Sequence, residues 1–136
     1  IGTDLSTAMV ESARRGLYPM DRARMVPPAY LKRFCLKGQG DQTGQVLMSR
    51  DLRAKVRFEQ ANLMQPMPDW LPQFDVIFLR NVMIYFNGDT KRQVVKRLLS
   101  RLRPGGYFLI SHSESLNGID DTLKVVKPSI YRKPDA

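Results

Sequence analysis

Polar side chains follow three strand-like segments of the sequence, and their types suit the binding of a nucleoside. Asp4 ends an extended N-terminal segment, and Asn62 follows a second one. The pair Arg80 and Asn81 comes directly after the apolar run 74–79. A carboxylate at a strand end can accept hydrogen bonds from the two hydroxyls of a ribose. The amide of Asn62 can donate to a base edge and accept from it at once, although turn or capping roles for Asp4 and Asn62 remain open alternatives.

A second candidate site lies in the glycine-rich segment that begins at Lys37. Gly38, Gly40 and Gly44 fall close together beside this lysine, as in loops that cradle a phosphate. The spacing matches neither the P-loop nor the dinucleotide fingerprint, and no helix follows. The segment therefore predicts a hairpin turn that leads into a strand over 45–49. Such a hairpin offers an edge strand, to which an extended peptide can add.

Metal sites and hydrolytic triads find little support in the sequence. The single His and the single Cys cannot supply the ligands of a usual zinc site, so we expect no bound metal. His112, Ser113 and Glu114 are the residue types of a triad. Because they are consecutive, their side chains cannot form a relay of nucleophile, base and orienting acid.

The cysteine content and the apolar pattern indicate a cytoplasmic protein. Cys35 has no second cysteine with which to form an internal disulfide, which favours a reducing compartment. The sequence contains neither a secretory signal nor an apolar run of about 18 or more residues. We therefore expect no membrane insertion.

The charge of the chain favours an anionic partner. Lys and Arg number 22 against 13 Asp and Glu, which leaves a formal net charge of +9. Because the basic residues are scattered through several segments, an acidic protein is a better expectation than nucleic acid. A solvated basic face is the alternative. The length of 136 residues and the hydrophobic content of 43% predict one domain with one core.

The segment 74–86 is expected to position the first candidate site. The β-branched and aromatic residues of 74–79 predict a strand that is buried on both faces. The apolar spacing over 89–102 predicts a helix after it. Open α/β sheets bind ligands beyond the carboxyl ends of their strands, which is where Arg80 and Asn81 fall.

The remaining segments continue an alternation of strands and helices. Ser6 is a suitable N-cap for a helix that ends at Gly16. The turn 103–106 is expected to end the helix over 89–102. Further elements are predicted as a helix over 29–34 in an otherwise irregular stretch 16–34, strands over 55–61 and 107–111, and a closing hairpin over 123–127 and 130–132.

Taken together, these residues resemble the bacterial chemotaxis receptor methyltransferases of the CheR family. The resemblance covers 1–136 in order and rests on Asp4, Asn62-Leu63, RNVMIYF over 80–86, the turn 102–106 and SHSES over 111–115. RNVMIYF and SHSES are specific, whereas the turn LRPGG is shared by many class I methyltransferases. The resemblance implies a mostly parallel, Rossmann-like α/β sheet and S-adenosylmethionine as methyl donor, with S-adenosylhomocysteine as product. It also implies receptor glutamate γ-carboxylates as acceptors, in bacterial chemosensory adaptation.

Site roles carry over from this family by position. The resemblance assigns donor contacts to Asp4, Asn62, Leu63, Arg80 and Asn81. Asp4 is expected to hold the ribose, and Asn62 with Leu63 to contact the adenine. Arg80 and Tyr85 are expected to stand near the transferable methyl and the incoming glutamate. A salt bridge at the end of the sheet is the alternative role for Arg80.

The glycine-rich hairpin has a counterpart in part of the family. There a small β-subdomain docks the C-terminal peptide of the receptor through glycines and basic residues. Gly38, Gly40 and Gly44 are similar to that pattern, and Lys37 supplies one positive charge. Leu47 stands where docking members carry a basic residue, which leaves peptide docking a hypothesis.

The resemblance also bears on the extent of the chain. It implies that 1–136 is the C-terminal part of the methyltransferase domain, with an inserted antiparallel β-subdomain over 35–54 and a C-terminal hairpin. An N-terminal helical domain, a first strand and a glycine-containing donor loop are then expected before Ile1, and 1–136 alone is expected to be inactive, and insoluble or molten. The intact protein is expected to be a monomer. Another methyl acceptor and a non-catalytic donor-binding or interaction domain remain as alternatives.

Overall fold

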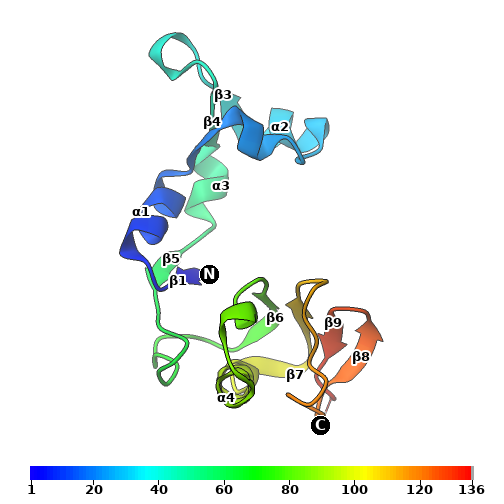
Figure 1. Cartoon of the computed structure of the whole chain (residues 1–136). Coiled ribbons are helices and arrows are strands. Elements are labelled where there is room, and N and C mark those ends of the chain that lie inside the picture. Colours follow the sequence, from blue (N-terminus) through cyan, green and yellow to red (C-terminus); the bar gives the residue numbers. More distant parts are fainter. Residues whose placement is uncertain (136) are drawn as a thin grey trace. The chain divides into compact units, whose positions relative to one another are not determined.

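The chain folds as two compact units, Ile1–Asn62 and Leu63–Ala136, in a computed structural model that describes residues 1–135 (Figure 1). The sequence predicted one domain with one core, so the division is a difference from that expectation. Its physical basis is that the strands form three separate sheets rather than one. Two of these sheets lie in the first unit and one in the second.

The first sheet of unit one is a parallel pair of β1 (Gly2–Asp4) and β5 (Phe58–Gln60). Helix α1 (Thr7–Arg15) follows β1 as predicted, with the Ser6 hydroxyl accepting the N–H of Met9 at 3.3 Å. Gly16 ends the helix in the left-handed conformation, with φ at 65°. The predicted strand over 55–61 is shortened to β5, because a helix that the sequence analysis missed, α3 (Arg50–Ala54), precedes it.

The second sheet of unit one contains the predicted hairpin. Strand β3 (Cys35–Lys37) pairs antiparallel with β4 (Gln45–Met48), and the turn between them holds the short helix η2 (Gly40–Gln42). A third strand, β2 (Leu17–Pro19), pairs with the other edge of β4. The sheet therefore begins at Leu17, before the predicted subdomain range of 35–54 and inside the stretch that was predicted to be irregular. The links are η1 (Met20–Ala23) and α2 (Pro28–Phe34), of which α2 was predicted.

Unit two holds a four-stranded sheet in the order β6-β7-β9-β8. Its elements are β6 (Phe74–Leu79), η3 (Met83–Tyr85), α4 (Gly88–Leu99), β7 (Leu102–Ile110), β8 (Lys124–Lys127) and β9 (Ile130–Arg132). The apolar face of α4 and the inner side chains of β7 form the core, in which Val94, Leu102 and Phe108 are fully buried. The predicted closing hairpin is confirmed as β8 and β9.

Strand β6 departs from its prediction as a strand buried on both faces. Val76 and Phe78 are 45% and 67% exposed, whereas Leu79 is buried. The reason is that β6 is an edge strand of its sheet and the core of unit two covers only one of its faces. An apolar run alone cannot tell a strand covered on one face from one covered on both.

One further expectation needs correction. Helix α4 ends at Leu99, with Ser100 as C-cap, and the turn 103–106 already lies inside β7, where Gly105 adopts a φ of 78°. The pairs β1–β5 and β6–β7 are parallel, and the antiparallel pairs are those of the inserted sheet, the closing hairpin and β7 with β9. Across residues 1–135, the structure contains no helix that is both long and apolar enough to cross a bilayer.

Candidate functional site

The crest loop, residues 80–86, joins the end of β6 to the start of α4 and carries the first candidate site. Strands β6 and β7 run parallel with Leu79 opposite Ile110, so the crest loop and the segment after β7 leave the same edge of the sheet. Asn81 adopts a φ of 60°. Few residues other than glycine adopt this conformation, and Asn is one of them. Leu79 and Met83 are buried and anchor the loop on both sides of Arg80 and Asn81.

The carboxylate of Glu114 holds the crest loop from the end of β7. Its oxygens accept the N–H of Asn81 at 3.0 Å and the N–H of Met83 at 3.1 Å. They also accept the N–H of Ser111 at 3.3 Å and its hydroxyl at 2.6 Å. We call these four hydrogen bonds the Glu114 clamp. The clamp joins two segments that lie more than 30 residues apart in the sequence.

The clamp changes the acidity of Glu114. Burial by itself raises the pKa of the carboxyl, but the hydrogen bonds from the Ser111 hydroxyl and from the three backbone N–H groups outweigh it and lower the pKa below the ordinary value of 4.5. The side chain is therefore an anion at neutral pH, and an anion is the form that accepts four hydrogen bonds.

Lowering the pH should release the Glu114 clamp. Because the pKa is lower in the folded than in the unfolded chain, the clamp stabilises the fold above the ordinary value of 4.5 and is lost as the pH falls through the folded pKa. We expect the amide protons of Asn81 and Met83 to shift together in an NMR titration, with a midpoint below 4.5. Glu114→Gln should remove this joint titration, and a midpoint at or above 4.5 in the unchanged protein would contradict it.

Arg80 and Tyr85, the predicted catalytic residues, both present exposed side chains on the crest loop. Tyr85 is 82% exposed, whereas Met83 beneath it is buried. Within residues 1–135 the guanidinium of Arg80 takes part in no ion pair or hydrogen bond, although six ion pairs occur elsewhere in that part of the chain. The alternative role of Arg80, a salt bridge at the end of the sheet, is therefore wrong for this structure. The guanidinium is available to a ligand.

Asp4 and Asn62 belong to unit one, where they follow the two parallel strands at the same edge. Asp4 lies opposite Gln60, and its carbonyl oxygen accepts the N–H of Ala61 at 3.0 Å. Asp4 Oδ1 accepts the N–H of Ser6 at 2.8 Å, so the capping role that the sequence left open is present. Oδ2 accepts no hydrogen bond from residues 1–135. Asp4 and Asn62 therefore lie at the carboxyl ends of two paired parallel strands.

Leu63 begins unit two and packs against its core, which makes the apolar side chain half-buried. Its carbonyl oxygen accepts a hydrogen bond from Arg97 of α4 at 3.0 Å. Leu63, Arg80, Asn81 and Tyr85 thus lie in unit two, and Asp4 and Asn62 in unit one. That Asp4, Asn62, Leu63, Arg80 and Asn81 bind one donor, with Arg80 and Tyr85 beside the acceptor, stays a prediction.

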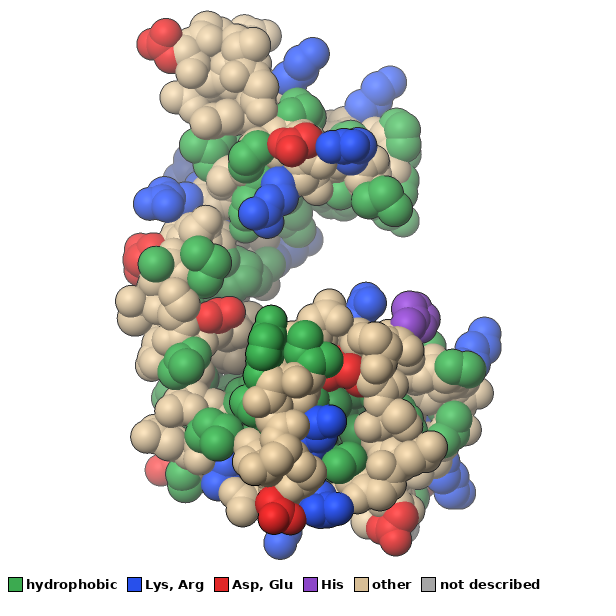
Figure 2. Space-filling model, in the orientation of Figure 1, with side chains coloured by type: hydrophobic (Ala, Val, Ile, Leu, Met, Phe, Trp, Pro, Cys, Tyr) green, Lys and Arg blue, Asp and Glu red, His purple; other side chains and the backbone are tan. Residues whose placement is uncertain are grey.

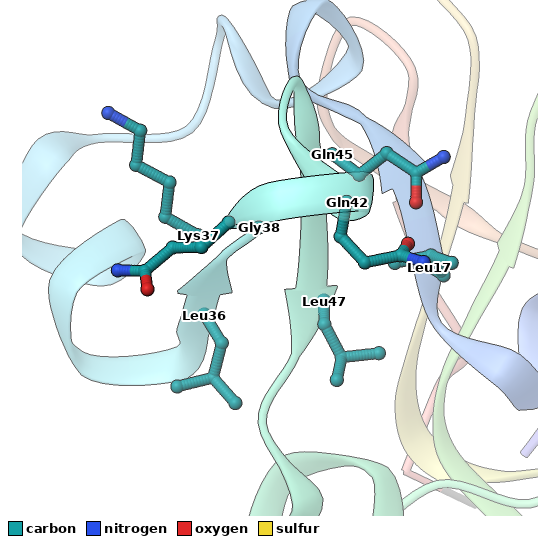
Figure 3. A pocket seen from close by; sticks show the side chains of 8 residues that line it. Leu17, Leu36, Lys37, Gly38, Gln42, Gln45 and Leu47 are labelled. Atoms are coloured by element: carbon teal, nitrogen blue, oxygen red, sulfur yellow. The ribbon is translucent and has the colours of Figure 1, made fainter.

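The hairpin of unit one forms a pocket of about 400 Å³. Leu17, Leu47 and Leu36 lie opposite one another on β2, β4 and β3, and we call them the leucine row. Figure 3 shows Leu36 and Leu47 side by side, with the Lys37 side chain extending away from them. The pocket is lined by the leucine row with Lys37, Gly38, Gln39, Gln42 and Gln45.

The predicted docking glycines fall into two groups. Gly38 lines the pocket, and a Cβ at this position would overlap the carbonyl oxygen of Gln42, so the tight turn requires glycine. Gly40 and Gly44 do not line the pocket and instead take φ values of 58° and 85° in the turn. Lys37 also lines the pocket, and its role in peptide docking stays a prediction.

Sequence reasoning gave no site role to several of these residues. Glu114 was named only among the residue types of a triad and within SHSES, and Leu17, Leu36 and the three glutamines of the pocket were given no role. For Glu114 the available signal was its position: it is an acidic residue shortly after β7, the strand that pairs with β6. No local signal marks Leu17 and Leu36, because cross-strand register brings them beside Leu47.

The comparison with known proteins decides the family. A family model described as CheR methyltransferase, SAM binding domain, matches residues 1–132. The chain belongs to this family. CheR membership confirms the resemblance and implies the class I methyltransferase fold, with S-adenosylmethionine as the cofactor of the domain.

Individual CheR relatives agree with the family model. The chain is 35% identical over 133 residues to Chemotaxis protein methyltransferase 2 of Pseudomonas aeruginosa. The aligned residues make up 96% of this chain and 47% of the relative. The chain is 34% identical over 131 residues to the Chemotaxis protein methyltransferase of Klebsiella aerogenes, with 95% and 44% covered. For the protein of the same name from Borreliella burgdorferi the identity is 37% over 133 residues, with 98% and 46% covered. The chain spans about half the length of these curated relatives.

The chemistry of the described residues fits the CheR cofactor. Asp4 lies at the end of a parallel strand with Oδ2 free of hydrogen bonds within residues 1–135, and a free carboxylate oxygen at such a position has the chemistry to accept a ribose hydroxyl. No group of His, Cys, Asp and Glu side chains within residues 1–135 is arranged to hold a metal ion.

Proposed function

We propose that this protein is a cytoplasmic protein-glutamate O-methyltransferase, which uses S-adenosylmethionine to methylate glutamate side chains of chemotaxis receptors. Family membership over residues 1–132 supports the donor and the class of reaction. The observation that carries the choice of acceptor is the exposed guanidinium of Arg80, which has no partner within residues 1–135. A planar guanidinium pairs bidentately with a carboxylate, which is the group that a glutamate brings.

The proposed reaction asks little acid–base chemistry of the protein. When bound, S-adenosylmethionine supplies a methyl group on a positively charged sulfur. A glutamate γ-carboxylate is already ionised at pH 7, so no general base is needed. Arg80 orients the carboxylate for in-line attack. Tyr85 ends the short helix that begins at the buried Met83, and its exposed side chain contacts the same acceptor.

The donor contacts are part of the same proposal. Asp4 accepts hydrogen bonds from the ribose hydroxyls through Oδ2, while Oδ1 keeps its bond to Ser6. Asn62 reads the adenine edge, Leu63 gives it an apolar neighbour, and Arg80 with Asn81 completes the donor contacts. The absence of a hydrogen bond to Asp4 Oδ2 within residues 1–135 supports this assignment.

Asp4→Asn should weaken donor binding without unfolding the first turn of α1. The amide oxygen of Asn can still accept the N–H of Ser6, but the charged acceptor for the ribose is lost. We expect the Kd of S-adenosylhomocysteine, measured by calorimetry on the intact protein, to rise roughly tenfold or more, as for loss of a hydrogen bond to a charged group. Asp89→Asn, on the exposed first turn of α4, is the matched control and should leave the Kd unchanged. Equal Kd values for both variants would remove Asp4 from the donor site.

A direct assay tests the acceptor. The intact protein is incubated with S-adenosylmethionine labelled in its methyl group and with the cytoplasmic region of a chemotaxis receptor. A labelled product that releases methanol in mild base is a methyl ester and supports glutamate as acceptor. Label that is stable in base, or that appears only on a small acid or a nucleic acid, points to another methyltransferase and contradicts the proposal.

We further propose that the pocket of unit one docks an extended peptide from the receptor. Strand β3 pairs with β4 on one side only, which leaves backbone groups for strand addition. The leucine row offers apolar contact beside this edge, and Lys37 offers one positive charge. On the face shown in Figure 2 the Lys and Arg side chains are spread over each unit and form no single basic patch. We therefore expect apolar residues of the peptide, in contact with the leucine row, to supply the specificity.

Leu36→Gln should reduce peptide binding with little effect on stability. Leu36 is 58% exposed, so little buried apolar surface is lost from the fold, whereas a bound peptide would cover it. We expect the Kd of a receptor C-terminal peptide, measured by calorimetry, to rise roughly tenfold. Leu5→Gln, at a leucine of unit one that is 62% exposed outside the pocket, is the control. Absence of saturable binding to the unchanged protein would end the docking proposal.

A further inference from the structure

The direction in which the Arg80 side chain leaves the sheet depends on the backbone on either side of it. On one side Leu79 is fixed by the ladder with β7 and by burial. On the other side Asn81 has a φ of 60°, a conformation that costs a non-glycine residue energy and persists only where its surroundings impose it. At this residue the backbone N–H donates a hydrogen bond to Glu114 Oε1 at 3.0 Å.

The second oxygen of Glu114 holds the middle of the crest loop. Oε2 accepts the N–H of Met83, at the start of the short helix that carries Tyr85. Oε1 is in turn fixed by the hydroxyl and the N–H of Ser111, which directly follows β7. A single carboxylate thus ties two backbone amides of the crest loop to the segment after β7.

We propose that Glu114 is a positioning residue of the methyl-transfer site, which holds Arg80 and Tyr85 in the orientation that the acceptor needs. The role rests on the proposed methyl transfer. Glu114 itself touches neither donor nor acceptor in this proposal. It acts through the backbone of Asn81 and Met83, so its replacement should affect the chemical step through Arg80.

The test is a double-mutant cycle with Glu114→Gln and Arg80→Ala in the intact protein. Gln keeps the size of Glu but replaces one acceptor oxygen by a donor, so the two amides of the crest loop cannot both be satisfied. We expect Glu114→Gln to lower kcat roughly tenfold and to raise the Kd of S-adenosylhomocysteine less than threefold, because Arg80 and Asn81 are only part of the donor contacts. In the Arg80→Ala background the same change should lower kcat less, by about two- to threefold, because only the positioning of Tyr85 is then left to be lost.

Hydrogen exchange gives a readout that does not depend on activity. Amides of Asn81 and Met83 should exchange faster in Glu114→Gln than in the unchanged protein, while amides in α1 should not change. Glu11→Gln, which removes an exposed carboxylate paired only with Arg14 within residues 1–135, is the matched control and should alter neither exchange nor kcat.

The outcomes separate the inference from the function on which it rests. Equal losses of kcat in both backgrounds would show a general structural effect and overturn positioning through Arg80. Unchanged exchange at Asn81 and Met83 would overturn the clamp itself. A protein that transfers methyl to no receptor acceptor, yet shows the expected exchange, would refute the proposed function and with it the positioning role.

Discussion

Replacing Arg80 by Ala should lower kcat/KM for the receptor acceptor by about two to three orders of magnitude, which is the scale for losing a group that orients a reactant. The reason lies in the geometry of the guanidinium, which can hold both oxygens of a carboxylate in one plane. Arg80→Lys keeps the charge without the planar fork, so we expect an intermediate loss. The measurement is the initial rate of methyl ester formation against receptor concentration.

The same substitution should leave the fold intact. Arg80 has no ion pair or hydrogen bond within residues 1–135, so truncation leaves no partner unsatisfied there. The thermal midpoint of Arg80→Ala should therefore match that of the unchanged protein. Arg92→Ala is the control for kcat/KM and should leave it unchanged. Arg92 is also an exposed arginine, but it lies on α4 outside the crest loop, where it pairs with Asp89 at 2.9 Å. A loss in kcat/KM below about threefold for Arg80→Ala would contradict its role in orienting the acceptor.

The largest expected effect on stability is at Phe108. Its side chain is 0% exposed, within the core that β7 and α4 form in unit two. Phe108→Ala removes the ring and leaves a cavity, so the free energy of unfolding should fall by about 3–5 kcal/mol. The measurement is urea unfolding of the intact protein, monitored through a spectroscopic signal that comes from unit two.

Phe78 supplies a matched control for Phe108. It lies on the neighbouring strand β6, opposite Leu109, and is 67% exposed. Because the Phe78 side chain is exposed, Phe78→Ala should change the free energy of unfolding by no more than about 0.5 kcal/mol, as for other exposed sites. A loss of several kcal/mol at Phe78 would mean that this face is covered in the intact protein. A loss below about 1 kcal/mol at Phe108 would contradict the core described for unit two.

Local patterns predicted those parts of the fold that depend on neighbours in the sequence. Ser6 and Gly16 bound α1 because a cap needs only a hydroxyl or a positive φ at the right end of a helix. The glycines after Lys37 predicted the β3–β4 hairpin because tight turns need such residues. Helix α4 was predicted from its apolar spacing, but its end was placed too late because the turn 103–106 belongs to β7.

The candidate site was predicted less completely than the fold. Asp4, Asn62 and Arg80 were identified because each follows a strand and has a side chain suited to a ligand. The pattern could not show that Arg80 has no protein partner or that Asp4 divides its oxygens between Ser6 and a free position. Those facts depend on where other side chains lie, and spacing along one segment carries no information about them.

The sequence by itself determined the family and its donor, because the CheR family model matches residues 1–132 on sequence alone. Only the tertiary structure decided which side chains act together. The parallel register of β6 and β7 brings Glu114 to Asn81, and the antiparallel register of β2, β4 and β3 aligns the leucine row. It also left Val76 and Phe78 exposed on an edge strand. Strand pairing joins residues far apart in the chain, and such contacts leave no periodic trace in a local sequence.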